Sequence, residues 1–118
     1  EKRTEKRTVL LLECEGRFAV ERRSASGLLA GLWQLPNLTG ERTADEAMAE
    51  AAALETQPAQ LCRELRRTHV FTHIRWEMVC YHIRCRCAPP RFVWASPAEL
   101  RETYALPTAF RIFLEGEI

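Results

Sequence analysis

The chain has 118 residues, a hydrophobic fraction of 47%, a charged fraction of 28% and a formal net charge of +1 at pH 7. These values are typical of one folded domain with its own core, and they exclude a disordered segment. No apolar run approaches the roughly 18 residues of a membrane span. The near-neutral charge excludes a domain that attracts nucleic acid through its net charge alone.

The first residues and the cysteines bear on the origin of the chain. Residues 1–7 are mostly charged and contain no apolar stretch, so they are not a signal peptide. We expect them to be the end of a linker in a longer polypeptide, with the domain covering residues 8–118. The chain has 5 cysteines, and an odd number favours reduced thiols over a disulfide framework. We therefore expect a cytoplasmic protein.

The first half of the chain predicts a hairpin, a loop and a helix. Residues 8–13 and 17–21 are apolar or alternating and are separated by Glu15-Gly16, which predicts a β-hairpin. Residues 27–37 contain two glycines and a proline, which predicts a structured loop. Thr43 followed by Glu46 is a capping box, and apolar residues at helical spacing then predict a helix over about 44–55.

The second half predicts a long hairpin, a short strand and short helices. Residues 63–70 and 75–86 are expected to be strands joined by a tip at 71–74. Both faces of 75–86 are largely apolar, which indicates a central strand covered on both sides. A short strand at 92–94, a capped helix after Ser96 and a last helix from Leu106-Pro107 follow. The fold class is α/β, a mixed sheet with packed helices.

The loop before the first helix resembles a known signature. Gly31-Leu32-Trp33-Gln34-Leu35-Pro36 followed by a helix is similar to the signature region of Nudix proteins, which implies a Nudix-like fold. In active members the helix carries an Arg-Glu-x-x-Glu-Glu set whose carboxylates hold divalent metal beside a diphosphate. Here residues 50–55 read Glu-Ala-Ala-Ala-Leu-Glu, so only Glu55 keeps its carboxylate. We therefore expect no metal at this helix and no Nudix hydrolysis.

Several segments resemble a Nudix-like domain that lacks this metal set. The opening hairpin, Gly27–Pro36, His69-Val70-Phe71-Thr72-His73 and Ala105–Phe110 are similar to the C-terminal domain of A/G-specific adenine DNA glycosylases, the MutY type. The likeness covers roughly residues 8 to 114. It implies a domain that reads 8-oxoguanine opposite a mispaired adenine in base excision repair.

The resemblance gives Phe71, Thr72 and His73 the role of contacting the oxidised base. Oxidation at C8 turns the N7 acceptor of guanine into an N–H donor, and the Thr72 hydroxyl can accept that proton. Phe71 would act as an apolar wedge at a base step, and His73 would donate to a phosphate or brace the tip. The family more often has serine at the position of Thr72. The alternative from the residues alone is that Phe71 folds back onto the core and that Thr72 and His73 only shape a turn.

The implied partners are double-stranded DNA containing 8-oxoguanine opposite adenine and an N-terminal catalytic domain of the same chain. An iron–sulfur cluster is expected in that catalytic domain, with no cofactor in this part. Arg66, Arg67 and Arg75 are candidate phosphate contacts, although such clusters are commonly only solvated. We expect a monomer associated with the bacterial nucleoid through DNA. The alternatives are a nucleotide diphosphate hydrolase and a non-catalytic protein-interaction module.

The histidines and cysteines do not follow zinc-ligand spacing. No Cys-x-x-Cys occurs, and Cys85-x-Cys87 is too short for a usual ligand pair. Strand alternation places Cys80 and Cys85 on opposite faces. We therefore expect these residues, like the three tryptophans, to serve mainly in packing.

Overall fold

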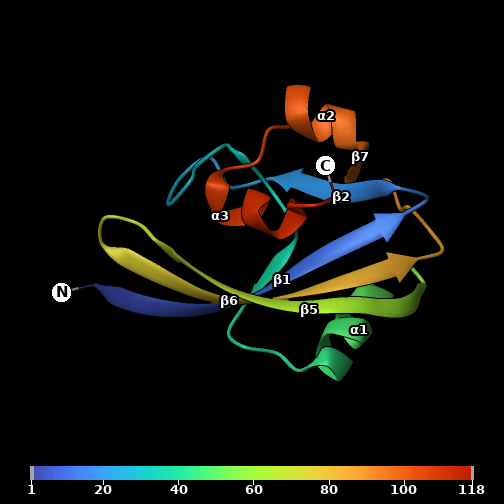
Figure 1. Ribbon diagram of the computed structural model, residues 1–118, viewed down its shortest axis with the longest axis horizontal. Coiled ribbons are helices and arrows are strands. Elements are labelled where there is room, and N and C mark those ends of the chain that lie inside the picture. The colour runs from blue at the N-terminus through green and yellow to red at the C-terminus, as the bar shows by residue number, and fades with distance from the viewer. Residues whose placement is uncertain (1, 118) are drawn as a thin grey trace.

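In a computed structural model that describes residues 2–117, one mixed sheet carries helices on both faces (Figure 1). The strands are β1 (Arg3–Cys14), β2 (Arg17–Arg22), β3 (Trp33–Gln34), β4 (Asn37–Thr39), β5 (Pro58–Val70), β6 (Ile74–Cys85) and β7 (Val93–Ala95). The helices are α1 (Ala44–Ala53), α2 (Pro97–Glu102), α3 (Thr108–Arg111) and the 3₁₀ turn η1 (Ile112–Leu114). The α/β class and the mixed sheet are confirmed. No helix in this range is long and apolar enough to cross a membrane.

The sheet has the strand order β3-β2-β1-β6-β5, with β4 paired to β1 and β7 paired to β2. β1 runs parallel to β6 from the pair Arg3 and Ile74 to the pair Glu13 and Arg84. β5 and β6 form the long antiparallel hairpin that the sequence predicts. β6 is therefore an interior strand between β1 and β5, and its alternating side chains reach both layers of the core.

Two apolar layers fill the two faces of the sheet. One contains Trp76 of β6, Phe110 of α3 and Phe113 of η1, all fully buried. The other contains Leu10, Val79 and Ile83 with the buried alanines of α1. Cys80 belongs to the first layer and Cys85 to the second, as the alternation along β6 predicts.

The capping boxes of α1 and α2 are both formed. Thr43 Oγ1 accepts a hydrogen bond from the Glu46 backbone N–H at 3.1 Å, and the Thr43 N–H donates to Glu46 Oε1 at 2.8 Å. Ser96 and Glu99 make the same pair of bonds at α2. α1 buries Ala47 and Ala51 against the sheet, and such small side chains let the helix lie close to the strands.

Several boundaries differ from the sequence prediction. β1 begins at Arg3, because residues 3–7 pair with β6, so this segment is a strand where we expected the end of a linker. β5 begins at Pro58, and the sheet accepts this proline because it opens an edge strand beside a bulge. α1 ends at Ala53, two residues early, because the chain turns through positive φ at Glu55 (68°) and Gln57 (51°).

Candidate nucleic-acid interface

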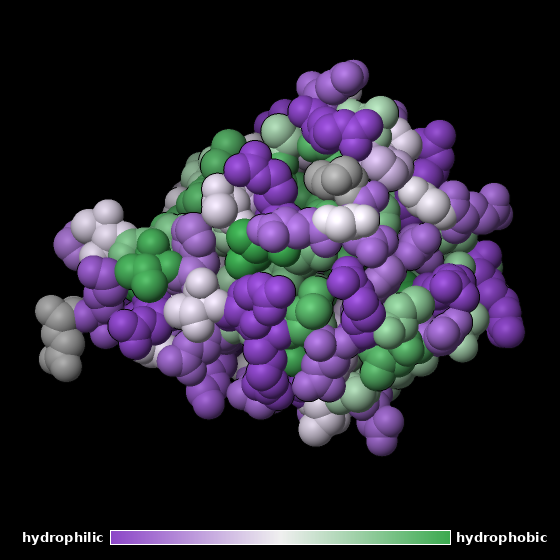
Figure 2. All heavy atoms as spheres, viewed as in Figure 1, coloured by the Kyte–Doolittle hydropathy of each residue, from purple (hydrophilic) through white to green (hydrophobic). Residues whose placement is uncertain are grey.

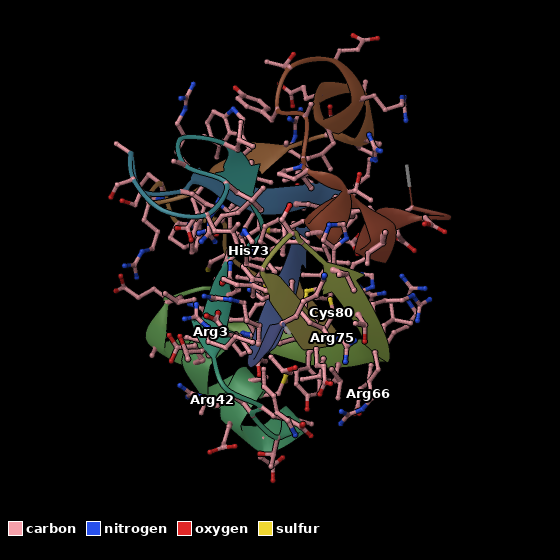
Figure 3. The ribbon with its side chains drawn as sticks, turned by 90° about the vertical axis from the view of Figure 1, so that its left-hand side faces the viewer. Arg3, Arg42, Arg66, His73, Arg75 and Cys80 are labelled. Atoms are coloured by element: carbon pink, nitrogen blue, oxygen red, sulfur yellow. The ribbon has the colours of Figure 1, made fainter. Side chains whose placement is uncertain are left out.

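The tip of the β5–β6 hairpin is a tight turn tied to the start of β1. The Phe71 N–H donates to the Ile74 carbonyl at 2.7 Å, and the Arg3 N–H donates to the His73 carbonyl at 3.2 Å. These bonds fix the backbone between the two strands, while the side chains of Thr72 and His73 remain exposed. Figure 3 shows His73 at this end of the molecule with Arg3 and Arg75 nearby. The tip therefore presents polar side chains from a fixed backbone.

Phe71 does not project freely from the tip. Its ring is half-buried and lies edge-to-face with Trp76 at a centroid distance of 5.0 Å and with His69 at 4.6 Å. Trp76 is fully buried and contacts Phe110 in the same manner. Phe71 is thus the outer member of an aromatic row that extends into the core. This is the folded-back arrangement that the residues alone left open.

A hollow of about 550 Å³ with a largely apolar lining lies at the tip. It is lined by residues of the tip and by one residue of the loop between β2 and β3. These are Val70, Phe71, Thr72, His73 and Ile74 of the hairpin and Leu28 of the loop. Val70 is 50% exposed, and Figure 2 shows a small apolar group at the hairpin end, on the left, next to hydrophilic residues. The exposed Thr72 and His73 therefore border an apolar hollow.

The loop that carries Leu28 is held by a network around Arg23. Arg23 Nε donates to the Leu28 carbonyl at 2.9 Å, and Arg23 Nη1 donates to Gln34 Oε1 at 2.7 Å. Burial lowers the pKa of the Arg23 guanidinium, and the nearby charge of Arg7 lowers it further. Arg7 and Arg23 both lie over the Trp76 ring, at 4.7 and 5.5 Å from its centroid. Trp76 thus contacts both Phe71 of the tip and Arg23, which holds the loop.

The three candidate phosphate contacts are not brought together. Arg75 pairs in register with Val70, so it lies at the tip and is exposed. Arg66 lies four residues before Val70, about 13 Å away along the strand. Its guanidinium pairs with Glu41 at 3.2 Å and Glu64 at 3.6 Å, and the hydrogen bond that it donates to the Glu41 carboxylate raises the pKa of Arg66.

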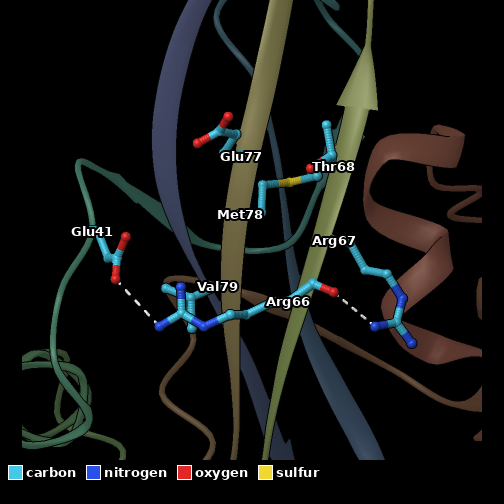
Figure 4. Close-up of a pocket in the computed structure, with 7 residues that line it drawn as sticks. All are labelled: Glu41, Arg66, Arg67, Thr68, Glu77, Met78 and Val79. Carbon is cyan, nitrogen blue, oxygen red and sulfur yellow. Dashed lines mark hydrogen bonds and ion pairs between the residues drawn. The ribbon is translucent and has the colours of Figure 1, made fainter.

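Arg67 is engaged in a different way. Its Nη1 donates to the Arg66 carbonyl at 2.7 Å. Arg66 and Arg67 line a second hollow of about 420 Å³ on β5 and β6, which also contains the carboxylates of Glu41 and Glu77 (Figure 4). A phosphate at this hollow would have to displace Glu41 from Arg66. The geometry therefore favours Arg75 over Arg66 and Arg67 as a phosphate contact.

Alanine and leucine occupy most of the positions at the end of α1 where active Nudix proteins carry metal-binding carboxylates. Ala51 is buried in the core, and Glu55 lies beyond the end of the helix and is exposed. Glu50 faces a small hollow of about 100 Å³ that also includes Glu21 and Arg91. Within residues 2–117, the group of three possible metal ligands lies elsewhere and includes no residue of α1.

Sequence reasoning did not single out Leu28, Arg3, Arg7 or Arg23 as parts of this region. Leu28 comes within reach of the tip only through the folded loop, and Arg3 only through the parallel pairing of β1 and β6. Arg7 and Arg23 carry no local motif, because their role depends on a tryptophan more than 50 positions away in the chain. No sequence signal apart from the loop resemblance pointed to them.

The fold and these segments match a known family. The chain belongs to the Nudix domain family, whose profile matches residues 7–116. A MutT protein from Methanosarcina mazei is similar in structure, with a TM-score of 0.66 and 20% identity over 99% of this chain and 94% of that chain. A MutT Nudix hydrolase from Burkholderia pseudomallei has a TM-score of 0.65 and 18% identity over 97% and 98%.

A third similar structure is the C-terminal domain of mouse MUTYH, solved in complex with human PCNA. Its TM-score is 0.64, with 24% identity over 94% of this chain and 85% of that chain. Identities this low show the shared fold alone. The Nudix fold of this chain is thus shared with MutT proteins, one of them titled a Nudix hydrolase, and with the C-terminal domain of mouse MUTYH.

Proposed function

We propose that this chain is the 8-oxoguanine recognition domain of an A/G-specific adenine DNA glycosylase and acts beside a catalytic domain of the same polypeptide. The observation that carries the proposal is the combination of a Nudix fold without the helix carboxylates and a fixed, exposed Thr72-His73 tip beside an apolar hollow. Hydrolysis of a nucleoside diphosphate needs several carboxylates for the metal, and of the Arg-Glu-x-x-Glu-Glu set residues 50–55 keep only the carboxylate of Glu55.

Thr72 is the residue proposed to distinguish 8-oxoguanine from guanine. Its exposed hydroxyl accepts the N7–H proton of the oxidised base, whereas unmodified guanine offers only an acceptor at N7. The hydroxyl can rotate to donate, so the discrimination depends on how firmly the fixed turn directs its lone pairs. An unpaired polar group in the contact costs about 1–3 kcal/mol.

Phe71 takes a modified role in this proposal. Because the ring lines the hollow while resting on Trp76, its outer edge can contact a base without leaving the core. A fully inserted wedge would break the contact with Trp76. We therefore propose that Phe71 forms the apolar floor on which the lesion base or its neighbour rests, with His73 and Arg75 directed toward the phosphates.

An NMR titration of this chain at low salt tests the proposal. Two duplexes are compared, one with 8-oxoguanine opposite adenine and one with guanine opposite adenine. Amide shifts centred on Phe71, Thr72 and His73, and larger for the oxidised duplex, are expected. Equal shifts spread over the arginines of β5 would overturn lesion readout by the tip.

A substitution in the enzyme that carries its catalytic domain gives a second test. Thr72→Ala is expected to reduce the preference for 8-oxoguanine over guanine by roughly 10-fold, because about 1.4 kcal/mol corresponds to a factor of ten. Thr72→Ser is the matched control, since it keeps the hydroxyl and removes only the methyl group. Unchanged discrimination in Thr72→Ala would remove Thr72 from the readout.

The MutT neighbours favour a second candidate, a Nudix-type nucleotide diphosphate hydrolase. This candidate predicts turnover of nucleoside diphosphates or triphosphates that requires magnesium or manganese and falls on Glu50→Gln or Glu55→Gln. The first proposal predicts no metal-dependent turnover by this chain.

A further inference from the structure

Three possible metal ligands meet at the edge of the core, far from one another in sequence. Glu13 lies near the end of β1, His82 on β6 and Glu117 in the turn after η1. One ligand atom from each lies within 4.8 Å of the others. We propose that Glu13, His82 and Glu117 form a binding site for one divalent transition-metal ion of the zinc type.

The distances suit such an ion after a small adjustment. His82 Nε2 and Glu13 Oε1 are 2.7 Å apart, close enough to share a proton. Zinc bonds of about 2.0–2.2 Å to nitrogen and oxygen place tetrahedral ligand atoms roughly 3.4 Å from one another. The ion would replace the shared proton, widen this pair by less than an ångström and draw Glu117 inward.

The imidazole is buried but fixed on one side only. His82 is 5% exposed, and its Nδ1 atom has no hydrogen-bond partner within residues 2–117. Its position therefore depends on the packing around it, including Phe18 at a ring distance of 6.2 Å, and on the bond to Glu13. An ion at Nε2 requires the neutral tautomer with its proton on Nδ1. The proton between Nε2 and Glu13 is therefore displaced, and Nδ1, which makes no other hydrogen bond, takes one up.

The local charge also favours a cation. Two carboxylates lie beside the imidazole, and Arg63 Nη2 lies 3.4 Å from Glu117 Oε2. Arg84 pairs in register with Glu13, but its Nη1 donates to Gln60 Oε1 at 2.7 Å. Arg63 can keep this contact while the other Glu117 oxygen binds the ion, as outer partners of ligating carboxylates commonly do. One imidazole with two carboxylates suits zinc and its neighbours better than magnesium or calcium, which prefer oxygen ligands alone.

This site is separate from the position where Nudix helices hold metal. By strand alternation His82 lies on the same face of β6 as Cys80, in the layer covered by α3 and η1, whereas α1 covers the other face. An ion here would fasten the C-terminal turn to β1 and β6. Its expected effect is stabilisation of the fold, independent of the role proposed for the tip.

Zinc titration of this chain in a Cys62→Ser, Cys87→Ser background tests the proposal, because these two thiols are the less buried ones. We expect one zinc ion per chain by calorimetry and an increase in Tm of about 4 °C or more at saturating zinc. Magnesium should give no such increase. Manganese should broaden NMR signals around His82 before those of the tip.

Glu117→Gln is the decisive variant, because this side chain lies outside the strands and its loss leaves the sheet intact. It should weaken zinc binding at least 10-fold and abolish the Tm increase, while Glu115→Gln, an exposed neighbour, should change neither. Absence of zinc binding in the parent, or binding unaffected by Glu117→Gln, would overturn the proposal.

Discussion

Phe71 links the proposed readout to the stability of the fold. Its half-buried ring contacts Trp76 and His69. Phe71→Ala should therefore lower the free energy of unfolding by about 1–2 kcal/mol, below the 3–5 kcal/mol typical of fully buried phenylalanine. Urea denaturation measures this change, with Phe71→Leu as a control that keeps most of the apolar contact. A change under about 0.5 kcal/mol would mean that the ring is free in solution.

Cys80 is the least reactive thiol that the structure predicts. Burial raises the pKa of Cys80 to about 12, so almost no thiolate exists at pH 8. Burial also raises the pKa values of Cys14 and Cys85. A thiol reagent at pH 8 should label Cys62 and Cys87 first and should reach Cys80 only after unfolding. Rapid labelling of Cys80 in the folded chain, located by mass spectrometry, would contradict this burial.

For single residues, the sequence predicted the face of a strand on which a side chain lies, but not which side chains from distant parts of the chain it contacts. The alternation of β6 correctly placed Cys80 and Cys85 on opposite faces, because strand geometry alone determines it. The same reasoning could not place Phe71, since a ring at a hairpin tip can face either solvent or core. It also could not find the cluster of Glu13, His82 and Glu117, because only tertiary pairing joins these residues.

At the scale of elements, the capping box of α1 gives a test that depends on pH. Hydrogen bonds from Thr43 lower the pKa of Glu46, so the folded chain holds this carboxylate ionised at a lower pH than the unfolded chain. The stabilisation is therefore present above the unfolded pKa, near 4.5, and is lost as pH falls through the folded pKa. Glu46→Gln should flatten the fall in Tm between about pH 5 and 3.

The cap itself contributes at every pH. Thr43→Ala removes the acceptor for the Glu46 backbone N–H and should cost about 1 kcal/mol at pH 7, with Thr43→Ser restoring most of it. Chemical denaturation of the three proteins at pH 7 checks this order. Equal stability of Thr43→Ala and the parent would show that water replaces the cap without cost.

Elements with local signals were predicted well, including the two hairpins, whereas segments that become strands only through pairing were missed or shortened. The two capping boxes marked the starts of α1 and α2, because the residues that make them are three apart in sequence. The strand at residues 3–7 was missed, because its charged residues form a strand only by pairing with β6. β5 was predicted five residues too short, because residues 58–62 join the strand through pairing with β6 that two register shifts interrupt.

For the whole molecule, the distribution of charge determines how the domain would meet DNA in the proposed function. The net charge is only +1, and Arg66 is already paired with Glu41 and Glu64. Arg3 and Arg75 lie at the end of the molecule that carries the tip (Figure 3). The proposed interface therefore presents few free cations, and contact with the base must supply what phosphate contacts do not.

This distribution predicts a shallow salt dependence of binding. Each phosphate contact adds about −0.9 to the slope of log K against log salt concentration. Arg3 Nη2 is paired with Glu5 Oε2 at 2.9 Å, so Arg75 alone gives a slope of about −1, and release of Arg3 from Glu5 brings it to about −2. Arg75→Ala should make the slope less negative by about 1, whereas Arg66→Ala should leave it unchanged because Glu41 already neutralises this residue. Fluorescence anisotropy with a lesion duplex over a range of salt measures both. A slope beyond about −5 would instead require the arginines of β5 and β6 to bind phosphates together, and the tip would then be only one part of a wide basic interface.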